Sequence, residues 1–166
     1  MRSILRIMYR NFITLLAVLL LSGCAWFSKG AVDFSCPKTG FVADANQVTF
    51  DDAHVAMTGI SGGCTLKNPH EVEVAITLPF TAQLTGAPLK QKTAAYFIAV
   101  LAPDETILQR QAFSTKIEFD KAGAGSSEEE HVLKIPLDNL DQAYKYKVAI
   151  GFALTPEQLK YNKEKK

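Results

Sequence analysis

A strictly alternating run at residues 71–82 constrains the fold of this chain more than any other stretch. Apolar side chains recur at every second position, and polar side chains occupy most positions between them. This period is typical of a strand with one buried and one solvated face, because successive side chains point to opposite sides of a sheet. Pro79 falls on the solvated side and predicts a sheet edge or a bulge there. The expected buried face consists of Val72, Val74, Ile76, Leu78 and Phe80.

The chain from residue 36 onward reads as further short strands separated by turns. We expect a turn at residues 36–40, an irregular extended segment as far as Phe50, and a loop at 121–130 that is rich in Gly, Ser and acidic residues. Ser61, Gly62 and Gly63 are expected to end the first strand. The pattern predicts an all-β, antiparallel β-sandwich of about seven strands. The other expected strands are residues 54–60, 94–101, 106–113, 114–119, 131–137 and 144–154.

A short helix is predicted at the C-terminus. Thr155 is a favourable N-cap, Pro156 suits the first helical position, and Gln158 completes a capping box. The helix is expected to end in the basic tail at residues 163–166, where lysines interact favourably with the helix dipole.

The segment from Leu140 to Tyr146, followed by alternating apolar residues, resembles the tyrosine corner of immunoglobulin-like and fibronectin type III domains. The resemblance implies that the Tyr146 hydroxyl bonds to the backbone near Leu140. Alternatively, Tyr144 and Tyr146 are ordinary strand aromatics. An immunoglobulin-like domain also needs one strand after this one. Either residues 40–50 fill the vacant place, or a strand edge is left open.

The N-terminus has the pattern of an export signal. Residues 1–11 are basic and lack acids, and residues 12–21 are an apolar run that makes about 15 Å of helix, too short to span a bilayer. The next step, Leu21-Ser22-Gly23-Cys24, resembles the lipobox of bacterial lipoprotein precursors. The alternative is an ordinary export signal that happens to contain a cysteine.

The lipobox resemblance implies a division of the chain. Residues 1–23 would be a cleaved signal peptide, 24–35 a tether lipidated on Cys24, and 36–166 a single domain. Ala25 after the cysteine implies sorting to the outer membrane of a Gram-negative bacterium. Two attached acyl chains would anchor the protein stably.

If Cys24 carries lipid, Cys36 and Cys64 remain as a pair in an oxidising compartment, and we expect a disulfide between them. Two free thiols are the alternative. A zinc site is disfavoured, because two cysteines without a spaced pair of histidines fall short of four ligands.

Motifs for catalysis, phosphate binding or metal binding are not found in the sequence. We therefore expect no enzyme activity, no cofactor and no metal, although Glu128, Glu129 and Glu130 could attract a divalent cation. Removal of residues 1–23 takes three arginines from 18 basic residues and leaves 15 against 17 acidic ones. This balance argues against a nucleic-acid partner.

Residues 24–166 also resemble small lipoproteins of Gram-negative bacteria. The shared features are the lipobox, Cys36-Pro37 soon after it, a second cysteine, and the stretch Val148 to Thr155 with the pattern Val-x-Ile-Gly-Phe-x-Leu-Thr. The resemblance implies no particular activity.

We expect a lipoprotein on the periplasmic face of the outer membrane that binds an envelope protein or assists envelope assembly, through pairing at a strand edge. The alternative is a lipoprotein that binds a small ligand or a divalent metal through residues 121–131. A hydrolase would require acids from distant strands to converge.

Overall fold

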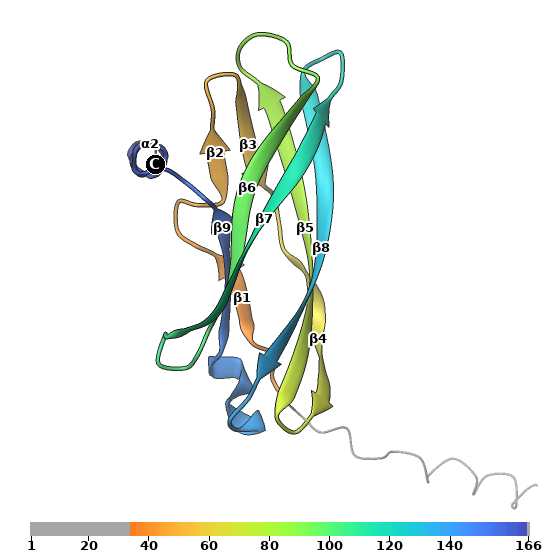
Figure 1. The fold of residues 1–166 in the computed structure, drawn as a ribbon, viewed down its shortest axis with the longest axis vertical. Coiled ribbons are helices and arrows are strands. Elements are labelled where there is room, and N and C mark those ends of the chain that lie inside the picture. Colours follow the sequence, from red (N-terminus) through yellow and green to blue (C-terminus); the bar gives the residue numbers. More distant parts are fainter. Residues whose placement is uncertain (1–33, 166) are drawn as a thin grey trace, which may run out of the picture. The chain divides into compact units, whose positions relative to one another are not determined.

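Nine strands and a C-terminal helix account for most of residues 34–165, the part of the chain that this computed structural model describes (Figure 1). Helix α2 is Pro156–Glu164, and a 3₁₀ helix at Leu140–Lys145 precedes the last strand. The strands are β1 Lys38–Phe41, β2 Gln47–Thr49, β3 Ala53–Met57, β4 Ser61–Asn68, β5 Glu71–Leu84, β6 Gln91–Leu101, β7 Ile107–Phe119, β8 Ala124–Pro136 and β9 Lys147–Phe152.

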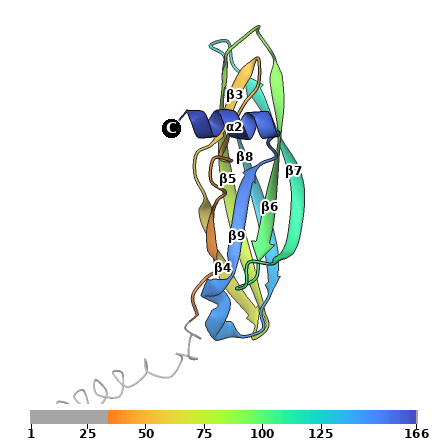
Figure 2. The same cartoon turned by 90° about the vertical axis from the view of Figure 1, so that its left-hand side faces the viewer.

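The strands form one mixed sheet in the order β1-β9-β6-β7-β8-β5-β3-β2, with β4 paired to β5 alongside β3. Only two residue pairs, Glu118–Ser126 and Phe119–Gly125, join β7 to β8. The sheet curls at this junction, so that β1, β9, β6 and β7 lie across the core from the other strands (Figures 1 and 2). Strand β1 runs parallel to β9, and the expectation of a wholly antiparallel sheet is therefore wrong for this pair.

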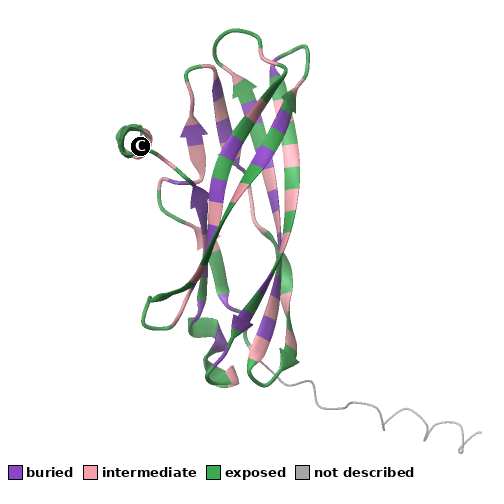
Figure 3. Ribbon diagram, in the orientation of Figure 1, coloured by how far each residue is buried: buried purple, intermediate pink, exposed green. Residues whose placement is uncertain are grey.

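The alternating strand predicted at residues 71–82 is confirmed and forms most of β5. All five residues of its expected apolar face are buried, and the same alternation is visible along the neighbouring strands (Figure 3). The ring centroid of Phe80 lies 5.2 Å from that of Tyr96 in β6 and 6.0 Å from that of Phe152 in β9. These aromatic contacts join the two halves of the curled sheet.

Strand β5 lies inside the sheet, although Pro79 lacks the N–H that an interior strand uses for pairing. The β4 ladder ends at Thr77 and the β3 ladder begins at Phe80, so Pro79 lies in the gap between two partners. The Pro79 carbonyl accepts a hydrogen bond from the Thr58 N–H at 3.0 Å. The predicted edge is therefore a local interruption of pairing on one side of β5.

Three boundaries predicted from the sequence are wrong. Ser61, Gly62 and Gly63 do not end a strand but begin β4, and the strand expected at 54–60 is the shorter β3. The two strands expected at 106–113 and 114–119 are one continuous strand, β7. The loop expected at 121–130 is mostly the first half of β8, which pairs with β5 over thirteen residues.

The acid-rich part of β8 is a strand because β5 needs a partner on that side. Unpaired buried backbone groups are costly, and a fourteen-residue strand inside a sheet presents many of them. Glu128 and Glu130 are exposed on the outer face of β8. A pairing requirement set by a distant strand thus outweighs the loop-like composition.

Tyr146 forms the bond that the tyrosine-corner resemblance implies, at a slightly different place. Its side chain is buried, its hydroxyl accepts from the Asp138 N–H at 3.3 Å, and it donates to the Asp138 carboxylate at 3.5 Å. Asp138 lies two residues before Leu140. Tyr144, in contrast, is an exposed residue of the 3₁₀ helix, and the last strand begins three residues later than expected.

The turn expected at residues 36–40 and the irregular segment after it are also corrected. Their backbone forms β1, which pairs with β9, and then β2, which pairs with β3. Strand β1 therefore takes the place beside the last strand that the sequence left vacant. Strands β1, β2 and β4 add three to the seven expected, and β7 replaces two expected strands by one, which gives nine among residues 34–165.

The C-terminal helix is confirmed together with its cap. The Thr155 hydroxyl accepts from the Gln158 N–H at 3.2 Å, and the Gln158 side chain accepts from the Thr155 N–H at 2.9 Å. No helix within residues 34–165 is long and apolar enough to span a membrane. Leu21, Ser22, Gly23 and Cys24 lie outside the described residues, as does the cleavage site.

Candidate interaction site at the β4 edge

Helix α2 covers the free edge of β2. The Asn162 side-chain amide donates to the carbonyls of Asp44 and Gln47, each at 2.8 Å, and the Gln158 amide donates to the Thr49 carbonyl at 3.4 Å. Asn162 is buried and α2 lies close to β2 (Figure 1). The helix thus satisfies carbonyls that a neighbouring strand would otherwise bind.

Side-chain contacts connect the two halves of the sheet along a seam, which we define as the region where the backbones of β7 and β8 separate. The Thr115 and Ser127 hydroxyls lie 2.8 Å apart, and the Tyr96 hydroxyl lies 2.8 Å from His131 Nε2. The Phe113 and His131 rings are 4.3 Å apart between centroids. Burial lowers the pKa of His131 and raises the pKa of Tyr96, so both groups are neutral at pH 7. This cluster is an interior seam between the two halves of the sheet.

The directions of the β5 backbone groups decide which part of β4 is free. The Pro79 carbonyl faces the β3 and β4 side, where it binds Thr58, and the Leu84 N–H faces the β8 side, where it binds Gly123 at 2.9 Å. Backbone groups of successive residues alternate between the two sides of a strand. Odd-numbered residues of β5 therefore face β3 and β4, and even-numbered residues face β8.

Three residues of β4 present their backbone groups to the open side. Gly62, Cys64 and Leu66 each pair in register with an even-numbered residue of β5. Directly opposed residues of an antiparallel pair either bond each other or both face away. Since the even-numbered residues of β5 face β8, the N–H and C=O groups of Gly62, Cys64 and Leu66 face away from β5. Strand β4 has no other partner among residues 34–165.

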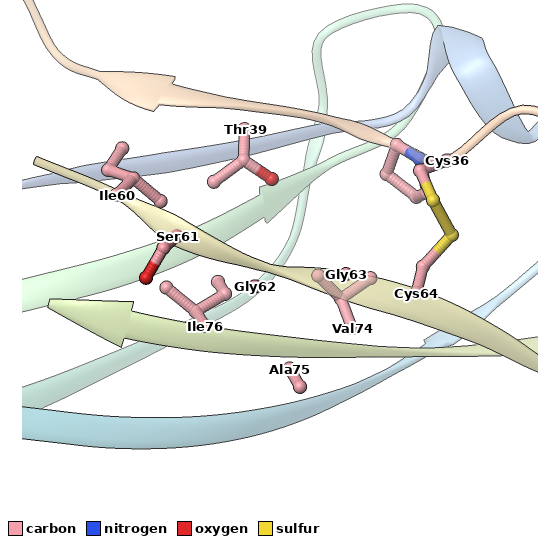
Figure 4. A pocket seen from close by; sticks show the side chains of 11 residues that line it. Cys36, Thr39, Ile60, Ser61, Gly62, Gly63, Cys64, Val74, Ala75 and Ile76 are labelled. Atoms are coloured by element: carbon pink, nitrogen blue, oxygen red, sulfur yellow. A yellow bond between two sulfur atoms is a disulfide. The ribbon is translucent and has the colours of Figure 1, made fainter.

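A hollow of about 310 Å³ lies beside this edge, between β4 and β1 (Figure 4). Ile60, Val74 and Ile76 supply apolar surface, and Gly62 and Gly63 leave the β4 side of the hollow without side chains. The arrangement offers unpaired backbone groups next to an apolar recess. These are the two elements that bind an extended peptide by strand addition.

The predicted disulfide between Cys36 and Cys64 is confirmed, and it bounds one end of the hollow (Figure 4). The two Cα atoms are 5.8 Å apart. An additional strand between two others needs about twice the 4.8 Å strand spacing. The disulfide therefore leaves no room for a partner strand at Cys64 itself, and a partner pairs with β4 on either side of it, at Gly62 or at Leu66.

The other predicted site residues are not brought together. Glu128, Glu129 and Glu130 alternate between the two faces of β8 and do not converge. Within residues 34–165, His, Cys, Asp and Glu side chains nowhere form a group of three that could hold a metal ion. His54 lies on β3, His70 in the turn between β4 and β5, and His131 on β8.

Sequence reasoning missed the β4 edge because Ser61-Gly62-Gly63 has the composition of a turn. The alternation of Cys64 and Leu66 with Thr65 and Lys67 was the signal that a strand continues there. Comparisons with protein-family models, with curated proteins and with solved structures found no match to this chain.

Proposed function

We propose that this protein is a lipoprotein on the periplasmic face of the outer membrane, and that its domain binds an extended segment of an envelope protein at the β4 edge. The observation that carries the proposal is the contrast between edges. Helix α2 covers β2, whereas Gly62 and Leu66 of β4 have outward-facing backbone groups on either side of the disulfide, and an apolar hollow lies beside Gly62. An uncovered edge of this kind is a template for strand addition.

The charges on the other free edges favour β4 as the binding edge. Strand β8 carries three consecutive glutamates and ends at Pro136, and β7 carries Arg110 and Lys116. Charged side chains and proline on edge strands oppose pairing with another chain. The part of β4 at Ser61, Gly62 and Gly63 has neither.

Lipid anchoring is supported by the sequence Leu21-Ser22-Gly23-Cys24 and by the disulfide. A disulfide between Cys36 and Cys64 is typical of an oxidising compartment such as the periplasm. Phe34, ten residues after Cys24, packs against the core. Residues 24–35 would then link the lipid on Cys24 to the domain.

We also propose that the curled sheet is a variant of the immunoglobulin-like sandwich. The bond between the Tyr146 hydroxyl and the Asp138 backbone supports this assignment. The alternative function, binding of a small ligand or divalent metal by residues 121–131, loses its premise, because most of that segment is strand β8.

A matched pair of variants tests strand addition. A photoreactive amino acid at the exposed position Thr65 should crosslink an envelope protein in cells. Leu66→Pro removes an N–H that faces the open side, whereas Leu66→Ala keeps that N–H and also loses the leucine side chain. We expect Leu66→Ala to retain the crosslinked product and Leu66→Pro to reduce it by roughly fivefold or more, as for a lost hydrogen bond.

The controls separate pairing from loss of structure. The same photoreactive residue at the exposed position Ser114 of β7 should not give this product. Thermal unfolding should show that both Leu66 variants are folded in the cell extract. Equal crosslinking in the proline and alanine variants would contradict binding through the β4 backbone.

Lipid anchoring has its own test. Cells that express the full chain with labelled palmitate should yield a labelled protein in the outer-membrane fraction. Cys24→Ser should abolish the label and release the protein from the membrane. A Cys24→Ser protein that still carries palmitate would exclude the lipobox assignment.

A further inference from the structure

A second hollow, of about 480 Å³, is lined by residues of other elements than those that line the hollow at the β4 edge. Its volume falls in the range of small-molecule sites. Segments distant in the sequence meet there: the loop after β1, strands β6 and β7, the residues that follow β9, and α2. Apolar surface comes from Val42, Phe97, Leu154 and Leu159, and positive charge from Arg110 and Lys163.

The absence of a side chain at Gly151 leaves space for the Phe97 ring. A Cβ atom at Gly151 would lie 3.3 Å from the Phe97 ring and 3.0 Å from the Ala45 Cβ. Glycine therefore lets the ring lie close to the β9 backbone. Gly151 and Leu154 belong to the Val-x-Ile-Gly-Phe-x-Leu-Thr stretch, so this stretch builds one wall of the hollow.

Phe97 in turn orients Arg110. The guanidinium carbon lies 4.5 Å from the centroid of the Phe97 ring, in cation–π contact. Stacking engages the face of the guanidinium and leaves the N–H groups at its edge available. Arg110 forms no ion pair or side-chain hydrogen bond with any residue in the range 34–165, and the same holds for Lys163.

The charge of the lining favours an anion. Arg110 and Lys163 contribute two positive charges and Asp44 contributes one negative charge, so the net charge is +1. A guanidinium held by stacking suits a carboxylate, which it binds through two parallel hydrogen bonds. The adjacent apolar surface suits an aliphatic chain, because burial of each methylene adds about 0.8 kcal/mol to binding.

We propose that this hollow, which we name the Arg110 site, binds an aliphatic carboxylate. Arg110 binds the carboxylate through its free N–H groups, and Lys163 provides a second cation at the rim. The aliphatic chain lies against Phe97, Leu154 and Leu159. The Arg110 site shares no lining residue with the hollow at the β4 edge, so the two sites are independent.

Titration of residues 34–166 with octanoate tests the proposal. This part of the chain forms a compact unit with its own core, and it can therefore be used without the N-terminal segment. Amide NMR signals of Phe97, Gly151 and Leu154 should shift and saturate. Acetate has the carboxylate without the long aliphatic chain, and octylamine has the chain without the carboxylate. Neither compound should give these shifts at the same concentration.

Two variants and one control test whether Arg110 and Lys163 bind the carboxylate. Arg110→Gln should weaken octanoate binding about tenfold, as expected for a lost charge-assisted hydrogen bond, and Lys163→Gln should weaken it by a smaller factor. Lys116→Gln removes an exposed cation from the same strand as Arg110, outside the hollow, and should leave the affinity unchanged. Equal binding of octylamine and octanoate, or an affinity unaffected by Arg110→Gln, would overturn the proposal.

Discussion

At the scale of single residues, two adjacent glycines in β4 have opposite requirements. Gly62 has a φ of +137°, a backbone conformation that L side chains rarely adopt, and a Cβ there would lie 2.0 Å from the Ala75 carbonyl oxygen. A Cβ at Gly63 would meet no atom within 4 Å. Gly62 therefore allows β4 to approach β5, and Gly63 only leaves the hollow open.

We predict that Gly62→Ala destabilises the domain by about 1–3 kcal/mol, because the new side chain forces the backbone away from β5. Gly63→Ala is the matched control and should change the free energy of unfolding by less than about 0.5 kcal/mol. Urea unfolding followed by circular dichroism measures both. Similar losses in the two variants would show that the close approach at Gly62 is not the cause.

At the scale of elements, α2 acts on the sheet through polar side chains. Its only buried residue among those described is Asn162, whose amide bridges the Asp44 and Gln47 carbonyls. The apolar stripe that usually holds a helix against a sheet is thus replaced by hydrogen bonds to a strand edge. The helix is consequently an edge cover rather than part of the core.

Asn162→Ala is predicted to reduce the free energy of unfolding by about 1–3 kcal/mol, because the two carbonyls lose their donor. Lys160→Ala, at an exposed position of the same helix, should have little effect. Hydrogen exchange provides a second measurement. The amides of β2 and α2 should exchange faster in Asn162→Ala while those of β5 stay protected, and uniform acceleration would argue against a local role.

At the scale of the whole molecule, few backbone pairs join the two halves of the curled sheet. Strands β7 and β8 share two residue pairs, and core contacts such as Phe80 with Tyr96 supply most of the remaining connection. The Cys36–Cys64 disulfide adds a covalent link between the segment before β1 and strand β4, which lie in opposite halves. Its two cysteines are 28 residues apart in the sequence.

Reduction of this disulfide is predicted to lower the free energy of unfolding by about 3–4 kcal/mol, from the chain entropy of a loop of this length. Denaturant unfolding with and without dithiothreitol gives the value. The double variant Cys36→Ala/Cys64→Ala should match the reduced protein and should not respond to dithiothreitol. An equal response in the double variant would mean that the reductant acts elsewhere.

Particular elements show how far the sequence could be interpreted alone. The β5 alternation, the α2 capping box, the bond from Tyr146 to the backbone and the Cys36–Cys64 pair all depend on local pattern or on the small number of candidates. The β4 edge and the Arg110 site could not be predicted, because each combines residues from strands that pair only in three dimensions. For the same reason, Ser61-Gly62-Gly63 was wrongly expected to end a strand, and Glu128-Glu129-Glu130 was wrongly expected to lie in a loop.

By itself, the sequence determined the all-β class, the buried face of β5, the helix cap and the disulfide, because side-chain periodicity, capping chemistry and cysteine count act locally or leave few choices. Only the tertiary structure decided that β1 runs parallel to β9, that residues 124–130 belong to a strand, and that α2 covers β2 while no other described residue pairs with the open side of β4. These outcomes depend on which backbone groups still lack hydrogen-bond partners once the long strand β5 is in place. No local sequence pattern determines those partners.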